Sequence, residues 1–155
     1  MAVVFGCSNA NQRSKVGVLT LKPDVKEMIA FANMSHDEMI EYLSEGKGFV
    51  LDYSDVIYKQ RVTELSLRDS NNSIEVIKTQ WKDRDSLFHS IHYEVRPSKD
   101  IEALGENITS NGFVLVEHNS QAEREYWLYR KDRYSLSVYK FNSKTLPVSV
   151  ELHKY

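Results

Sequence analysis

Alternation of apolar and polar residues dominates the chain and predicts strands. Residues 61–68 have a period of two, with Thr63, Leu65 and Leu67 on one face, residues 69–73 have the composition of a turn, and residues 74–81 are expected to return as the second strand. A period of two on both sides of a turn is typical of a hairpin. A further strand is expected over 86–96, its shared face made of Leu87, His89, Ile91, Tyr93 and Val95.

The last third of the chain has the pattern of a β-meander. Strands are predicted over 113–117, 124–131, 133–141 and 148–153, with a tight turn around Asp132. Short alternating runs joined by polar turns favour neighbouring antiparallel strands.

Three stretches have the helical period instead. One begins at Pro23, which is tolerated in a first helical turn. The second begins at Ser35, where Ser35 and Glu38 have the spacing of a capping box, and Gly46 is the expected end. The third is expected over 100–110, before Asn111 and Gly112.

The predicted fold is therefore α+β: an antiparallel sheet of about six to eight strands, with two to three helices packed on one face. A length of 155 residues favours a single globular domain. No internal repeat is evident. Residues 48–53 form a short apolar run that is expected to be a strand. Residues 52–60 fit a strand, a short helix or a loop that covers the sheet edge, and residues 1–14 fit a polar tether or an N-terminal hairpin.

The opening Val4-Phe5-Gly6-Cys7 has two incompatible interpretations. In the first, residues 2–6 and 15–21 are strands of a cytoplasmic domain. In the second, Cys7 is the lipidated residue of a bacterial envelope lipoprotein whose signal peptide is truncated here. The basic and apolar segments of a signal do not precede Cys7, which favours the first interpretation.

Composition narrows the function classes. The net charge of −2 predicts no general attraction to nucleic acid or anionic membrane. No apolar run approaches the roughly 18 residues of a transmembrane helix, so membrane contact is expected only through a lipidated Cys7. A single cysteine excludes an internal disulfide, and no motif predicts a cofactor.

Candidate chemistry is sparse. His89 and His92 have a spacing that binds metals on helices, but on a strand they are expected on opposite faces, so no metal site is predicted. Asp52, Asp55 and Glu64 are conceivable acid–base carboxylates. Cys7 is a conceivable nucleophile with His36, His89, His92 or His118 as base. Nothing in the surrounding sequence supports either set.

The hairpin 124–141 concentrates aromatic and basic residues. Such a mixture is used at protein interfaces and, less consistently with the net charge, for stacking on nucleic acid bases. Ordinary cross-strand packing is the alternative. The residues expected to bind are Arg124, Tyr126, Trp127, Tyr129, Arg130, Lys131, Arg133 and Tyr134.

The sequence thus predicts a non-enzymatic protein-binding domain of the immunity, inhibitor or phage and virion accessory type, with a cytoplasmic location. The alternatives are the lipoprotein anchored through Cys7 and a small enzyme or nucleic-acid binder that uses the hairpin 124–141. The partner expected is another protein.

Overall fold

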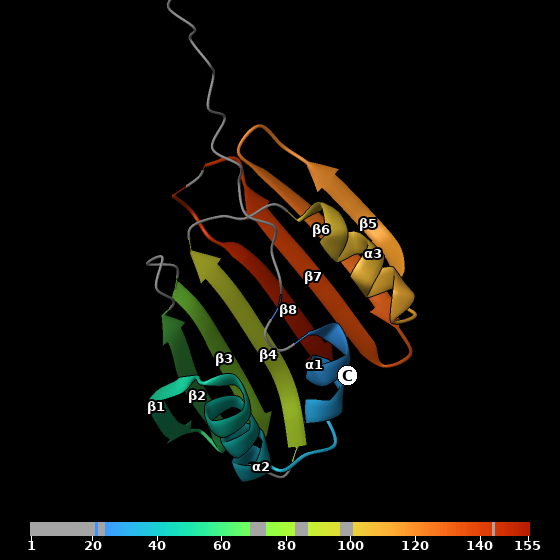
Figure 1. Ribbon diagram of the computed structural model, residues 1–155. Coiled ribbons are helices and arrows are strands. Elements are labelled where there is room, and N and C mark those ends of the chain that lie inside the picture. The colour runs from blue at the N-terminus through green and yellow to red at the C-terminus, as the bar shows by residue number, and fades with distance from the viewer. Residues whose placement is uncertain (1–20, 22–23, 69–73, 83–86, 97–100, 144) are drawn as a thin grey trace, which may run out of the picture.

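One open antiparallel sheet of eight strands carries three α-helices on one of its faces (Figure 1). The structure is a computed structural model that describes residues 21, 24–68, 74–82, 87–96, 101–143 and 145–155. The helices are α1 Val25–Phe31, α2 His36–Glu41 and α3 Glu102–Ser110, and the π-helical turn η1 Tyr42–Gly46 continues α2. The strands are β1 Val50–Ile57, β2 Gln60–Arg68, β3 Ile74–Lys82, β4 Leu87–Arg96, β5 Val114–Ser120, β6 Arg124–Lys131, β7 Tyr134–Phe141 and β8 Val148–Lys154. The predicted α+β fold is confirmed.

Capping boxes start the first two helices. At Ser35, the backbone N–H of Glu38 donates to Ser35 Oγ at 3.3 Å, and the Ser35 N–H donates to Glu38 Oε2 at 2.7 Å. The box predicted from the sequence is therefore present. Asp24 and Glu27 make the same pair of bonds, both at 2.8 Å, at the start of α1. These bonds satisfy amide groups that a helix leaves without partners.

A β-bulge changes which residues of β4 face the core. Trp81 of β3 pairs with Phe88, whereas Gln80 pairs with Ser90, so His89 is the extra residue. Phe88 therefore takes the core position that the alternation assigned to His89, and the predicted shared face is wrong there. One inserted residue inverts the direction of the side chains beyond it.

The segment left open by the sequence, 52–60, completes the first hairpin. β1 continues to Ile57, and Tyr58 and Lys59 form the turn with left-handed φ values of 49° and 67°. Two left-handed residues match the twist of a two-residue hairpin. The strands predicted over 2–6 and 15–21 lie outside the described residues, except for Leu21, and so does Cys7.

The strand order β1-β2-β3-β4-β8-β7-β6-β5 reads as two copies of one unit. In each copy a helix leads into a four-stranded meander. We call α2 to β4 the N-terminal unit and α3 to β8 the C-terminal unit. Their last strands, β4 and β8, pair antiparallel in the middle of the sheet. The architecture is a twofold repeat.

The repeat also has a short sequence signature, which corrects the expectation of no internal repeat. Residues 48–51 and 112–115 are both Gly-Phe-Val-Leu. Gly48 and Gly112 have φ values of 78° and 86°, where glycine is favoured. Phe49 and Phe113 are each only 2% exposed. The edge strand that follows is bulged in both units, after Leu51 and after Leu115.

The π-helical turn marks one extra residue in the N-terminal unit. The Phe49 N–H donates to the carbonyl of Leu43, six residues back, whereas the Phe113 N–H donates to that of Ile108, five back. Leu43 and Ile108 are both fully buried. The π-helical turn accommodates the extra residue and still leaves Leu43 in the core.

Candidate functional site

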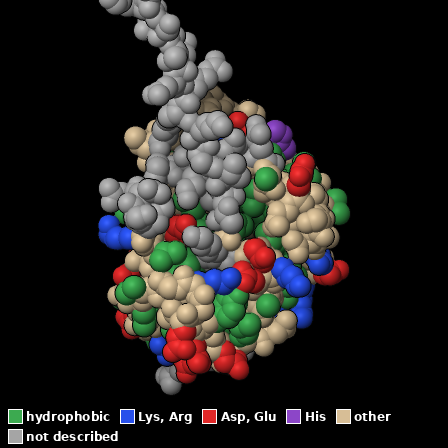
Figure 2. Space-filling view, in the orientation of Figure 1, with side chains coloured by type: hydrophobic (Ala, Val, Ile, Leu, Met, Phe, Trp, Pro, Cys, Tyr) green, Lys and Arg blue, Asp and Glu red, His purple; other side chains and the backbone are tan. Residues whose placement is uncertain are grey.

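Most of the exposed large hydrophobic side chains among the described residues belong to the two edge strands of the sheet. On the face drawn in Figure 2, hydrophobic side chains lie among charged and polar ones. Among the described residues, eleven large hydrophobic side chains are exposed. Six belong to β1 and its turn, and three belong to β5. The six are Val50, Leu51, Tyr53, Val56, Ile57 and Tyr58. Among the described strands, β1 and β5 lie at the edges of the sheet, so each has backbone groups that pair with no other described strand.

β1 presents the longer of these two edges. All eight of its residues are exposed, and apolar residues lie on both of its faces. The register puts Leu51 opposite Leu65 on the helix-covered face, whereas Tyr53 lies opposite Glu64 on the open face. An added strand would therefore find apolar contacts above and below its backbone.

One backbone group of this edge is occupied by the chain itself. The hairpin closes with the pair Ile57–Gln60, so ladder alternation directs the Val56 N–H away from β2. The Asp55 Oδ1 accepts from that N–H at 2.7 Å. The carboxylate stands where the carbonyl of an added strand would bind.

β5 is a less apolar edge. Its exposed apolar residues are confined to Val114, Leu115 and Val116, and the rest of the strand is polar. His118 stacks on Trp127 of β6, with ring centroids 5.1 Å apart and planes 7° apart. The edge with more exposed apolar side chains is thus that of β1.

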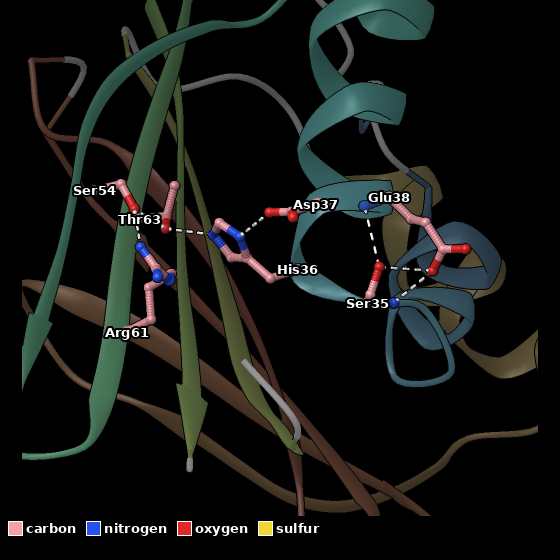
Figure 3. A network of polar contacts seen from close by, with 7 residues as sticks. All are labelled: Ser35, His36, Asp37, Glu38, Ser54, Arg61 and Thr63. Carbon is pink, nitrogen blue, oxygen red and sulfur yellow. Dashed lines mark hydrogen bonds and ion pairs between the residues drawn. The ribbon is translucent and has the colours of Figure 1, made fainter. Parts of the chain in front are cut away.

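A network of polar side chains connects β1 to β2 and to the start of α2 (Figure 3). The His36 ring at the start of α2 lies 2.8 Å through Nε2 from Thr63 Oγ1 on β2. Thr63 Oγ1 lies 3.1 Å from Ser54 Oγ on β1, and Arg61 donates to that same Ser54 oxygen at 3.2 Å. The network therefore connects the first helix of the N-terminal unit to the middle of its edge strand.

The same network contains an acid, a histidine and a hydroxyl, as a catalytic triad does, but its hydroxyl is not accessible to a substrate. Asp37 Oδ1 lies 3.1 Å from His36 Nδ1, although the Asp37 side chain is 100% exposed. Thr63, whose hydroxyl His36 contacts, is 0% exposed. A nucleophile must reach the substrate, and its orienting acid works best when shielded from water. We therefore assign the network to positioning β1.

The eight residues predicted to bind do not form one surface. Strand pairing places Arg124, Tyr126 and Arg130 on the open face. It places Trp127, Tyr129, Lys131 and Tyr134 on the helix-covered face. Arg133 lies in the β6–β7 turn. Tyr129 and Tyr134 are buried, and Lys131 donates to the carbonyl of Asn111 at 2.7 Å.

The candidate carboxylates are also separated. Asp52 and Asp55 are exposed on β1, whereas Glu64 accepts from Lys78 at 3.2 Å. Tyr53 Oη donates to Asp55 Oδ2 at 3.2 Å. Asp55 and Glu64 thus each have a partner that is not another candidate carboxylate.

The bulge in β4 places His89 on the open face, together with His92, although the alternation of a regular strand predicted these two histidines on opposite faces. The His89 and His153 rings have centroids 5.7 Å apart. His92 lies one pair further along the same face, beside Glu94 at 3.6 Å. Burial, with help from Lys82 and His153, lowers the pKa of His89. Within the described ranges, no three His, Cys, Asp or Glu residues are arranged to hold a metal ion.

The sequence could have indicated the β1 edge through its repeat. Gly-Phe-Val-Leu occurs twice at a separation of 64 residues, each time between a predicted helix and a predicted strand. A repeated unit suggests equivalent edges, but which strands lie outermost depends on pairings between distant segments.

No protein-family model matches the chain, and no similar protein was found among curated proteins or solved structures. No helix in the described part of the chain has the length and apolar character needed to cross a membrane.

Proposed function

We propose that this chain is a non-enzymatic protein-binding domain that takes an extended segment of another protein onto the β1 edge. The observation that carries the proposal is the exposure of all eight β1 residues, five of them large and hydrophobic. In strand addition, main-chain bonds give affinity, and pockets for alternate side chains give specificity.

The kind of partner segment that we propose follows from the chemistry of β1. Within Val50–Ile57 the charged residues are Asp52 and Asp55, both acidic. The apolar residues lie on both faces of the strand, so the partner needs apolar side chains on both sides as well. We therefore propose a partner strand in which Val, Ile or aromatic residues are interspersed with Lys or Arg.

The test uses Val56→Pro. Because the Val56 N–H points away from β2, proline removes no ladder bond there and is tolerated on an edge strand. It does remove the donor that an added strand needs and places a ring in its path. The matched control is Ser120→Pro, at the equivalent position of β5.

Immobilised wild-type chain is offered a displayed library of extended eight-residue segments. We expect enrichment of apolar and basic segments, with binding lost in Val56→Pro and kept in Ser120→Pro. Equal binding by wild type and Val56→Pro would refute strand addition at β1. Self-association of the wild type that Val56→Pro abolishes would show instead that a second copy occupies this edge.

The cytoplasmic location stays a prediction, as does the alternative lipid anchor on Cys7. The intact mass of the protein from its native host separates them, because a lipidated Cys7 adds the mass of its acyl groups. Unmodified protein in the cytoplasmic fraction is the expected result.

A further inference from the structure

A hollow lies on the open face of the C-terminal unit, away from the β1 edge. It has a volume of about 270 Å³ and is lined by Glu117, Asn119, Gln121, Arg124, Tyr126 and Tyr139. These residues come from β5, β6, β7 and the β5–β6 turn. Three of them, Arg124, Tyr126 and Tyr139, belong to the hairpin 124–141 that the sequence singled out.

Aromatic rings and polar groups converge in this hollow. Tyr126 and Tyr139 pack with ring centroids 4.9 Å apart and planes tilted by 36°. Burial, together with the nearby Tyr126, raises the pKa of Tyr139, so its phenol stays a neutral hydrogen-bond donor. Among the described residues, no carboxylate forms an ion pair with Arg124, which is exposed and available to a ligand.

The N-terminal unit shows that the fold does not require these side chains. Tyr126 pairs with Asn119 and Tyr139, just as Val62 pairs with Asp55 and Gln80. The position of Arg124 corresponds in the same way to Gln60. The repeat thus accommodates Gln, Val and Gln where the C-terminal unit has Arg, Tyr and Tyr.

Charge and hydrogen bonding narrow the ligand class. Arg124 supplies only donors, Glu117 only acceptors, and Asn119 and Gln121 supply both. A strongly anionic ligand would face Glu117, and a purely apolar ligand would leave the amides without partners. Sugar hydroxyls donate and accept at once, while the C–H groups of a pyranose ring pack on aromatic side chains.

We propose that this hollow binds a neutral sugar ring, as a monosaccharide or the end of a glycan. The volume lies just below the usual range for drug-sized ligands, which suits a single ring. The site lies on the open face of the other unit and does not depend on strand addition at β1.

Saturation-transfer NMR on the full chain tests the proposal. The probes are the methyl glycosides of glucose, galactose, mannose and N-acetylglucosamine, and adenosine monophosphate represents the anionic alternative. We expect saturation transfer to at least one glycoside, with a dissociation constant of about 1 mM. Amide shift changes should centre on residues 117–126.

The variants come from the other unit. Arg124→Gln, Tyr126→Val and Tyr139→Gln each introduce the residue that the N-terminal unit has at that position, so folding should be kept. Arg124→Gln should weaken glycoside binding about tenfold or more, because it removes a charged hydrogen-bond donor. The matched control, Gln80→Ala at the position of the N-terminal unit that corresponds to Tyr139, should bind as the wild type does.

Three results would overturn the proposal. They are no transfer to any of the four glycosides, equal transfer in the wild type and all three variants, or binding of adenosine monophosphate alone. Circular dichroism identifies any variant that fails to fold, and the other two variants then decide the outcome.

Discussion

Removing the Thr63 hydroxyl should destabilise the protein, although the change is small in volume. In Thr63→Val, His36 keeps its buried position but loses the oxygen that lies 2.8 Å from its Nε2. His36 is only 6% exposed and Thr63 is 0% exposed, so water cannot replace the lost partner. Valine has nearly the same shape and suits a strand, so no large cavity forms.

The expected cost is that of leaving one buried polar group without a partner, about 1–3 kcal/mol. Urea denaturation followed by tryptophan fluorescence measures it, since Trp81, one of the two tryptophans, contacts the His36 ring edge-on. Ser54→Ala removes the outer hydroxyl of the network and should cost no more than about 0.5 kcal/mol, since Ser54 is exposed.

A double-mutant cycle separates the hydrogen bond from packing. Combined with His36→Leu, Thr63→Val should cost less than it does alone, because no unpaired nitrogen is then left behind. A Thr63→Val protein within about 0.5 kcal/mol of the wild type, or an additive cycle, would refute the role assigned to this network.

Three further predictions follow from features described above. Gly48→Ala and Gly112→Ala should each lower the free energy of unfolding by about 1–2 kcal/mol, because alanine is strained at positive φ; thermal denaturation in which one of them is neutral would contradict the equivalence of the two units. Asp55→Ala should raise the affinity of segments selected on β1 about fivefold, because the Val56 N–H becomes free, and unchanged affinity in titration calorimetry would count against that. The lowered pKa of His89 means that the unfolded chain takes up its proton at a higher pH, so the free energy of unfolding should fall as pH drops below about 6.5. His89→Gln should make that fall shallower, and an identical pH profile would contradict the assignment.

Local patterns predicted the local structure well. The capping box at Ser35, the hairpin of β2 and β3 and the C-terminal strands depend on residues a few positions apart, and the sequence displays those spacings directly. The bulge at His89 was missed because alternation assumes an unbroken register, and only the pairing with β3 shows the extra residue.

The candidate sites needed information that no local pattern contains. β1 was only partly predicted, and its edge position follows from the pairing of β4 with β8 far along the chain. The sequence indicated the hairpin 124–141 only through its aromatic and basic composition. The residues of this hairpin divide between two faces of the sheet, however. The hollow that contains Arg124 and Tyr126 also needs residues that β5 and β7 bring to the open face.

The palindromic strand order has a consequence for how the chain folds. Within each unit every strand pairs with its sequence neighbour, so both meanders can form through short loop closures. Among the pairings between described strands, only that of β4 with β8 joins segments far apart in the sequence, such as Tyr93 with Val150. We expect the two units to form early and the β4–β8 pairing to form last. Substitutions in the β4–β8 interface should therefore speed unfolding and leave the folding rate of each unit unchanged.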